Sequence, residues 1–419
     1  MGAPSKRAGA RKISQEHLQE LEELADTAGA IVVGELTQQL EKPHPGTYLG
    51  SGKIDELRDL VADKTATLVI FDDELSPSQG KNIEDTVGTR VVDRAELILD
   101  IFATRARTAE AKMQVELAQL EYMLPRLTRM WTHLEKYRGG IGMRGPGETQ
   151  LETDRRLIHH RIKLLKERLR DVQKGRVVQR QSRQREYRAS LVGYTNAGKS
   201  SILAALSGSE DILIEDRLFA TLDPLTREVD VGEATVLVTD TVGFIRKLPH
   251  HLVASFRATL EETAEADLLL HVVDARHPTW EEQRRVVESV LDELGVGDRP
   301  RLLVFNKIDL LREEEWLTLQ ERIGRLVKEA VFVSAVSEGG LDPLRRALGG
   351  AVRARRPLAE IRLSPGDGKL LAEIHRKGEV LDQRMDGDRL VIRARVDEAL
   401  AGRLRQAGAE VVSRNGTPA

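Results

Sequence analysis

One stretch of eight residues, Gly193 to Ser200, constrains the fold of this chain more than any other. It reads Gly193-Tyr194-Thr195-Asn196-Ala197-Gly198-Lys199-Ser200, which fits the phosphate-binding loop pattern. Apolar residues 189–192 predict a strand before it, and residues 201–206 predict a helix after it. In such a unit the glycines let backbone N–H groups turn towards a phosphate, and the helix N-terminus adds its dipole. The alternative is an ordinary glycine turn followed by an unrelated lysine. Other motifs in the sequence are needed to distinguish it from a phosphate-binding loop.

Three short motifs follow, each at the end of an apolar, strand-like run. Asp240-Thr241-Val242-Gly243 offers a carboxylate for Mg²⁺ and a glycine N–H for a γ-phosphate. Asn306-Lys307-Ile308-Asp309 ends in a carboxylate that suits the paired donors of guanine. Adenine lacks that edge and would leave the charge unpaired, at about 1–3 kcal/mol or more. Ser334-Ala335 can present a backbone N–H to the guanine oxygen. Because parallel sheets bind ligands at the carboxyl ends of their strands, this order predicts a GTPase domain.

Composition sets broad limits on the remaining chain. The 419 residues suffice for three or four domains, and 64 basic against 67 acidic residues leave a net charge of −3. With no cysteine, disulfides and cysteine nucleophiles are excluded, as in a reducing cytosol. No apolar run reaches the length of a membrane helix, and the basic N-terminus lacks the apolar core of a signal peptide. We therefore expect a cytoplasmic protein with no membrane contact, and a monomer.

The region before the loop predicts two units. Strand-like runs at 30–33, 67–71 and 90–92 alternate with helical runs at 14–28, 53–63 and 76–87, which indicates a small parallel α/β domain over residues 1–93. Residues 94–138 then read as helix almost without interruption, with Pro125 expected to kink or divide it. Glycine-rich residues 139–150 form a loop, and residues 151–183 a second long helix. This order predicts an antiparallel helical hairpin over residues 94–185 with the loop at its tip.

The second helix of this hairpin is strongly basic. Between Arg155 and Arg188 there are 13 Lys or Arg residues and three acids. A solvated helix face is the ordinary explanation of such a run. Here the excess is one-sided and adjoins the tip, so we favour contact with RNA phosphates. The predicted RNA contacts are Arg144, Gly145, Gly147, Arg155 and Arg156.

After the loop we expect a GTPase domain at 186–350 and a small α+β domain at 358–419. The strand-like runs at 359–363, 379–384, 388–396 and 409–412, with helices at 368–376 and 397–407, indicate a split βαβ arrangement. No residue there looks catalytic, which favours a docking or regulatory module. Within the GTPase domain, His271 lies in a buried strand and is interpreted as a hydrogen-bonded interior side chain.

With these features in view, the chain resembles the HflX family of ribosome-associated GTPases. The resemblance covers residues 21–347 and rests on Tyr48 to Lys53, Gln114 to Leu120, Arg144 to Arg156, Phe219 to Pro224 and Asp240 to Ile245, besides the phosphate-binding loop. It implies Thr221 as the switch threonine over Mg²⁺ and γ-phosphate. It also implies binding to the large ribosomal subunit, with the tip near the rRNA of the peptidyl-transferase region, and the splitting of stalled or idle ribosomes under stress. Family members often have an apolar strand before the first helix, which this chain lacks, so the N-terminal sheet is expected to be one strand short or the start of the chain shortened.

The predicted nucleotide site combines the motifs and the resemblance. The catalytic residues are Lys199, Thr221 and Gly243, and the Mg²⁺ ligands are Ser200, Thr221 and Asp240. GTP or GDP is expected to contact residues 193–200 together with Ser201, Phe219, Ala220, Thr221, Leu222, Asp223, Asp240, Thr241, Val242, Gly243, Asn306, Lys307, Ile308, Asp309, Ser334 and Ala335.

Two residues of this site leave alternatives open. Asn196 either helps to bind K⁺ beside the phosphates or simply favours the turn. Phe244 stands where many GTPases place the glutamine that orients the attacking water, which predicts slow basal hydrolysis. Either the switch is inactive, or another group positions the water once the switches are ordered; we favour the second, which predicts stimulation by the large subunit. An RNA chaperone or ribosome-assembly factor that uses the nucleotide only as a signal is the alternative to a ribosome-splitting factor. A tRNA- or metal-handling GTPase would leave the tip sequence unexplained.

Overall fold

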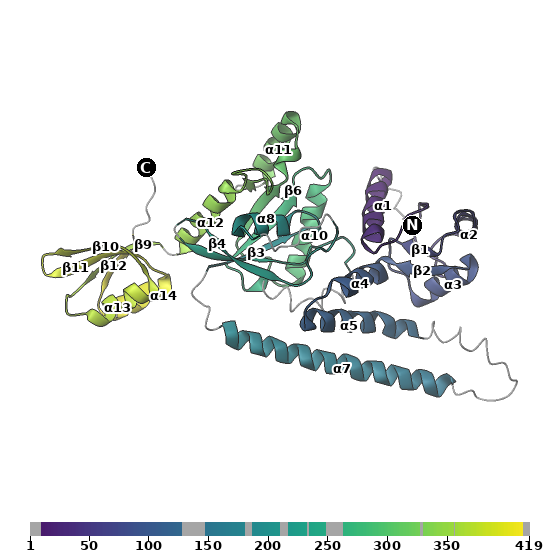
Figure 1. Ribbon diagram of the computed structural model, residues 1–419, viewed down its shortest axis with the longest axis horizontal. Coiled ribbons are helices and arrows are strands. Elements are labelled where there is room, and N and C mark those ends of the chain that lie inside the picture. Colours follow the sequence, from purple (N-terminus) through teal and green to yellow (C-terminus); the bar gives the residue numbers. More distant parts are fainter. Residues whose placement is uncertain are drawn as a thin grey trace.

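The computed structural model describes residues 10–127, 147–180, 187–209, 217–232, 234–248, 263–326, 330–355 and 357–413 (Figure 1). Over these residues the chain has the predicted α/β class, with a two-stranded, a six-stranded and a four-stranded sheet. In chain order the helices are α1 (Ala10–Thr27), α2 (Ser51–Lys64), α3 (Pro77–Val87), α4 (Arg94–Arg105), α5 (Ala109–Met123), α7 (Gly147–Arg180), α8 (Lys199–Ser207), α10 (Trp280–Glu293), α11 (Glu313–Leu326), α12 (Asp342–Arg355), α13 (Gly368–Lys377) and α14 (Glu398–Gln406).

The six-stranded sheet forms the centre of the molecule. Its order is β4 (Leu225–Asp230), β5 (Thr235–Asp240), β3 (Tyr187–Gly193), β6 (Leu268–Asp274), β7 (Arg301–Asn306) and β8 (Ala330–Phe332). All neighbours are parallel except β4, which runs antiparallel to β5. Leucine and valine side chains pack one face against α8 and α12, and the other face against α10 and α11. The loops after β3, β5, β6 and β7 therefore meet at one edge, where ligands of such sheets bind.

The N-terminal domain is smaller than its sequence predicts. Its sheet has two parallel strands, β1 (Leu68–Phe71) and β2 (Arg90–Asp93). The strand predicted at 30–33 is wrong: this segment forms no strand, and Ile31 is 89% exposed. Residues of this segment and of β1 line a groove of about 470 Å³.

The first arm of the hairpin differs from an uninterrupted helix. The chain leaves helical geometry at Ala106, which ends α4, and Thr108 then caps the start of α5 by accepting from the N–H of Ala111 at 3.1 Å. Pro125 divides the helix as expected, because α5 ends at Met123 and the short 3-10 helix η1 (Leu124–Arg126) follows. Residues 128–146, which include most of the predicted tip, lie outside the described residues.

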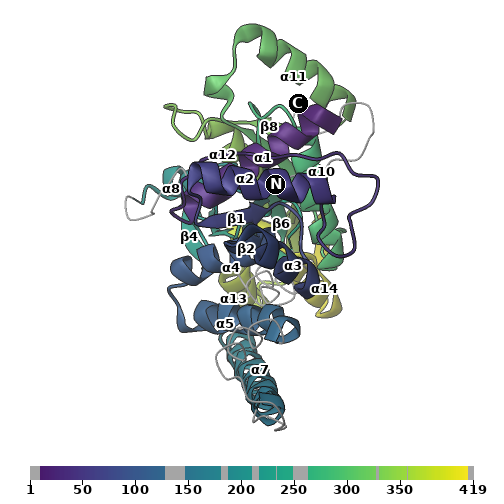
Figure 2. The ribbon, with the colours of Figure 1, turned by 90° about the vertical axis from the view of Figure 1, so that its right-hand side faces the viewer.

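The second arm is the 34-residue helix α7, antiparallel to α5. It begins at Gly147 rather than Leu151, so the last four residues of the predicted tip are helical. Arg161 is bidentate to Glu116 of α5 at 2.6 and 2.9 Å, Lys166 pairs with Glu121, and Leu165 packs on Leu117. Figure 2 shows α7 beneath α5, nearly end-on.

A single apolar core joins these N-terminal elements to the six-stranded sheet. It contains Leu18, Leu21 and Leu24 of α1, as well as residues of α4, α5, α10 and the strand β3. The first arm of the helical hairpin and the six-stranded sheet are therefore packed together.

The C-terminal domain has the predicted split βαβ arrangement. The sheet order is β10 (Glu379–Asp386), β11 (Arg389–Arg395), β9 (Leu358–Leu363) and β12 (Glu410–Ser413), with every pair antiparallel. Helices α13 and α14 cover its buried face. Among the described residues, no helix is both long enough and apolar enough to span a membrane.

Candidate active site

The phosphate-binding loop lies between β3 and α8, at the carboxyl edge of the central sheet. Two glycines are required by close approach: a Cβ on Gly193 would overlap the carbonyl oxygen of Val272, and one on Gly198 would overlap the side-chain amide of Asn306. Gly198 also has a φ of 90°, a region that favours glycine. The sequence pattern thus corresponds to close contacts with the backbone of β6 and with the Asn306 side chain at the end of β7.

Lys199 is the buried cation of this loop. Its Nζ donates to the carbonyl oxygens of Tyr194 at 2.9 Å and Gly193 at 3.3 Å. Burial lowers the pKa of Lys199 to about 8, although the neighbouring Asp240 opposes the shift. An anion placed beside Nζ would restore the charged form, because an opposite charge favours ionisation. The loop is therefore built to receive negative charge.

Three oxygen-bearing side chains that are far apart in sequence converge beside Lys199. The Ser200 hydroxyl donates to Asp240 Oδ2 at 2.6 Å and lies 2.8 Å from the Thr221 hydroxyl. Burial raises the pKa of Asp240, and among the described residues its Oδ1 has no hydrogen-bond partner. Two hydroxyls and an under-bonded carboxylate form an oxygen donor set, which is what Mg²⁺ prefers.

The segment after Asp240 is paired with the phosphate-binding loop. The N–H of Phe244 donates to the carbonyl of Gly193 at 3.0 Å, and the N–H of Thr195 donates to the carbonyl of Phe244 at 2.8 Å. A Cβ on Gly243 would lie 2.8 Å from Thr195 Cα and 3.1 Å from Lys199 Nζ, so glycine allows this approach. The Phe244 ring is buried in the apolar core and does not face the site.

The end of the site predicted to bind the base is tied to the loop by Asn306. Its amide donates to the carbonyl of Ala197 at 3.0 Å, and its oxygen accepts from the N–H of Ala335 at 3.3 Å. Lys307 donates to the carbonyl of Asn196 at 2.8 Å and pairs with Asp274 at 2.7 Å. Asp309 is exposed beside them in the short helix η3 (Ile308–Leu310).

Eleven of the 24 residues predicted to contact the nucleotide line one small cavity of about 50 Å³. It is lined by Thr195, Asn196, Gly198, Lys199, Ser200, Ser201, Arg217, Phe219, Ala220, Thr221, Thr241 and Gly243. Leu222 and Val242 are buried in the core instead. The structure also does not bring Asp223 to this cavity, since its carboxylate accepts hydrogen bonds from the start of α5.

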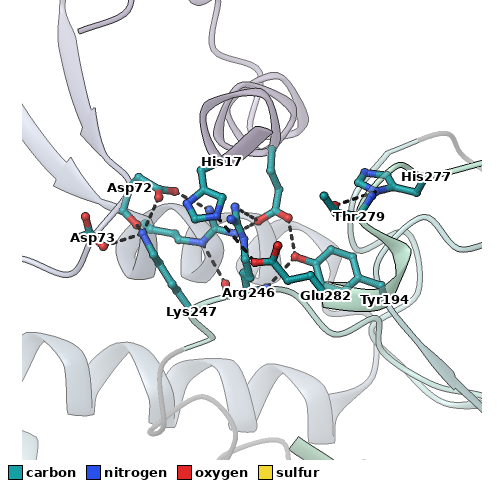
Figure 3. Close-up of polar contacts among 11 residues, drawn as sticks. His17, Asp72, Asp73, Tyr194, Arg246, Lys247, His277, Thr279 and Glu282 are labelled. Carbon is teal, nitrogen blue, oxygen red and sulfur yellow. Dashed lines mark hydrogen bonds and ion pairs between the residues drawn. The ribbon is translucent and has the colours of Figure 1, made fainter. Parts of the chain in front are cut away.

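A polar network that the sequence did not reveal joins this site to the N-terminal domain (Figure 3). Arg94, buried at the start of α4, pairs with Glu20 and with Asp72 at 2.8 Å. The Tyr194 hydroxyl donates to Glu20 and accepts from the N–H of Arg246 at 2.9 Å. The network therefore connects the phosphate-binding loop to helices α1 and α4.

Lys247 extends the same network beyond Gly243. Its Nζ lies 2.6 Å from carboxylate oxygens of both Asp72 and Asp73 (Figure 3). The backbone of Lys247 has a φ of 52°, which is unfavourable for a residue other than glycine and is held here by tertiary contacts.

Arg217 lines the cavity and is another site residue that the sequence motifs did not predict.

His271 requires a correction. It is fully buried, as expected, but neither ring nitrogen has a hydrogen-bond partner among the described residues. Burial lowers the pKa of His271 to about 3, so the ring is neutral.

Comparisons with known proteins agree with this geometry. Residues 15–103 match the family model described as GTP-binding GTPase N-terminal, residues 105–183 match GTP-binding GTPase Middle Region, and residues 188–307 match 50S ribosome-binding GTPase. GTPase HflX of Caldanaerobacter subterraneus subsp. tengcongensis is 45% identical over 93% of this chain and 90% of its own length. GTPase HflX of Escherichia coli is 44% identical over 89% of this chain and 88% of its own length. A crystal structure of a GTP-binding protein from Sulfolobus solfataricus in complex with GDP covers 81% of this chain and 96% of its own, at 25% identity and a TM-score of 0.44.

The six-stranded sheet, the loop at its edge and the matches to the family models and to the HflX relatives define a P-loop GTPase, which binds GTP and hydrolyses it to GDP and phosphate. GTPases of this class hold Mg²⁺ with the nucleotide, and the oxygens of Ser200, Thr221 and Asp240 fit that ion. The identity with relatives extends over most of the chain, and the protein belongs to the HflX family of GTPases.

Proposed function

We propose that this GTPase is a cytoplasmic factor that binds the large ribosomal subunit through its helical hairpin and splits or rescues stalled ribosomes under stress. The observation that carries the proposal is the hairpin itself: its second arm α7 is a 34-residue helix, on the order of 50 Å long at 1.5 Å per residue, and its first arm α5 shares an apolar core with strand β3 of the central sheet. The family model that matches residues 188–307 is described as a 50S ribosome-binding GTPase, which supports the large ribosomal subunit as the partner.

The charge on α7 supports contact with rRNA only in part. Arg161 and Lys166 bridge to acidic residues of α5, so they stabilise the hairpin. Arg155 and Arg156 are exposed one to three turns from the start of α7, on the side of the predicted tip. Arg144 and Gly145 lie outside the described residues. We therefore assign the RNA contact to the tip and the first turns of α7.

In the proposed site, Lys199 binds the β- and γ-phosphates, the N–H of Gly243 faces the γ-phosphate, and Asp309 binds guanine. A magnesium ion held by Ser200, Thr221 and Asp240 would neutralise phosphate charge during hydrolysis. Potassium beside Asn196 stays a prediction. The φ of 59° at Asn196 lies where asparagine is favoured, so the turn alone can account for this residue.

The tip prediction can be tested by binding to large subunits. Changing Arg144, Arg155 and Arg156 to Ala should weaken co-sedimentation in the presence of a non-hydrolysable GTP analogue. The slope of log affinity against log salt should fall by about 2–3, since each lost phosphate contact removes roughly one unit. Arg285, Arg299 and Arg346, exposed on the GTPase domain, provide a control with the same change in charge. Equal binding of both triple variants and the wild type across salt would rule out the tip as the RNA contact.

The proposed partner should also stimulate hydrolysis. The Phe244 ring is buried and cannot hold the attacking water, so turnover without ribosomes should be slow and large subunits should raise it. A Phe244→Gln variant should not reach the stimulated wild-type rate on its own. If large subunits leave the GTPase rate unchanged, ribosomes do not stimulate this switch. If Phe244→Gln without ribosomes reaches the rate of the stimulated wild type, the missing glutamine alone explains the slow basal hydrolysis.

A further inference from the structure

Asp223 points away from the nucleotide cavity and towards the base of the hairpin. Its Oδ2 accepts hydrogen bonds from the N–H groups of Arg107 and Thr108, both at 3.2 Å, and its Oδ1 accepts from the Thr108 hydroxyl. These donors lie in the break between α4 and α5, where the chain turns into the first arm of the hairpin. A carboxylate with three donors is a strong, directional anchor.

Apolar contacts dock the same segment at the same place. The side chains of Leu218, Phe219 and Leu222 are buried in the core that contains residues of α4 and α5. The rings of Phe219 and Phe102 meet edge to face, with centroids 4.6 Å apart. Phe219 has a φ of 56°, which is unfavourable for a phenylalanine unless such contacts hold it.

Thr221 lies between these anchors and faces the other way. Its hydroxyl is 2.8 Å from that of Ser200, beside Asp240. The segment 218–223 therefore has its apolar side chains and Asp223 against the hairpin base, while Thr221 reaches the predicted metal site. Any movement of the break at 106–108 relative to the sheet would move Thr221 with it.

We propose that Asp223 is a positioning residue that docks segment 218–223 on the α4–α5 break and thereby holds Thr221 at the magnesium site. The hairpin base then acts on the γ-phosphate end of the site, because α5 is joined to α7 by Arg161, Lys166 and a leucine contact. This coupling is reciprocal: a ligand that requires Thr221 favours the docked segment, and a partner that holds the hairpin in its docked position favours that ligand. The proposal rests on the GTPase site proposed above, but its test needs no ribosome.

The test compares nucleotides in two altered forms of the full-length protein. Asp223→Asn replaces one acceptor oxygen of the carboxylate by an NH2 group, which cannot accept a hydrogen bond. Thr108→Asp keeps a helix-capping side chain but places a second negative charge against Asp223. Thr108→Ser keeps both hydroxyl contacts and is the conservative control. Affinities for Mg²⁺ with a non-hydrolysable GTP analogue, and for GDP, are measured by titration of fluorescent nucleotides.

We expect both altered forms to bind the GTP analogue about tenfold more weakly, a typical coupling between two sites. GDP affinity should stay within about twofold, since GDP has no γ-phosphate for the switch threonine to cover. Hydrogen exchange of residues 218–223 should become faster, and Thr108→Ser should match the wild type. An unchanged affinity for the analogue would overturn the proposal, and so would an equal loss for analogue and GDP. Failure of the wild type to bind large subunits, with these nucleotide effects intact, would instead count against the proposed function alone.

Discussion

Lys199→Ala is expected to weaken GTP binding by about 100-fold or more. The buried Lys199 ammonium group is bonded to the carbonyl oxygen of Tyr194 in the loop. Its hydrogen bonds to the phosphates of GTP would join oppositely charged groups and together contribute roughly 3 kcal/mol to the binding free energy. The fold should not suffer, because burial already disfavours this charge, as the lowered pKa shows. Fluorescent GTP titration measures the loss, and Lys64→Ala, an exposed lysine of α2, serves as the control.

The same lysine should give GTP affinity a pH dependence. Burial lowers the pKa of Lys199 to about 8 in the free protein, and a bound phosphate raises it again. Below pH 8 the ammonium group is already present before binding, so this residue gives GTP affinity no pH dependence there. Above pH 8 binding must take up a proton, and affinity should fall by up to tenfold per pH unit. Lys199→Ala should lack this fall between pH 7 and pH 9; the same fall in that variant would assign the titration to another group.

The motifs that could be predicted from the sequence share one physical property: each is a short continuous stretch at the end of a strand. The motif Gly193 to Ser200 is contiguous, so its residue types can be recognised in the sequence without knowledge of the contacts made with β6 and β7. The parallel sheet then brings Ser200 and Asp240 together without any further information. The C-terminal domain could be predicted for a similar reason, since alternating apolar residues mark its strands.

Contacts between distant segments could not be predicted in this way. Arg94 looks like an ordinary charged residue at a helix start, yet it is buried against Glu20 and Asp72 from two other elements. Asp223 belongs to a motif that the resemblance places at the nucleotide, but tertiary contacts direct its side chain to Thr108. The strand predicted at 30–33 had suitable residues and no neighbour to pair with, because β-propensity expresses fit to a sheet rather than a property of the segment.

Asp309→Asn is expected to reduce GTP affinity by roughly 100-fold and to shift preference towards xanthosine triphosphate. The Asp309 carboxylate is exposed at the edge of the sheet, so its replacement leaves the packing intact. Two hydrogen bonds from guanine to a charged acceptor are lost, at about 1.5 kcal/mol or more each. The added carbonyl of xanthine accepts from the new amide, which restores one contact.

The surroundings of Asp309 make this exchange specific for the base. Asn306 ties the loop that carries Asp309 to both Ala197 and Ala335, so the base end and the phosphate end keep their spacing in the variant. Competition titrations with guanosine, xanthosine and adenosine triphosphates measure the shift, and Asp298→Asn, an exposed change before β7, is the control. If Asp309→Asn keeps the GTP affinity of the control, the guanine contact does not lie at Asp309. If it loses GTP without gaining the xanthine nucleotide, the carboxylate supports the loop rather than the base, because only a direct contact exchanges the donor amine of guanine for the acceptor carbonyl of xanthine.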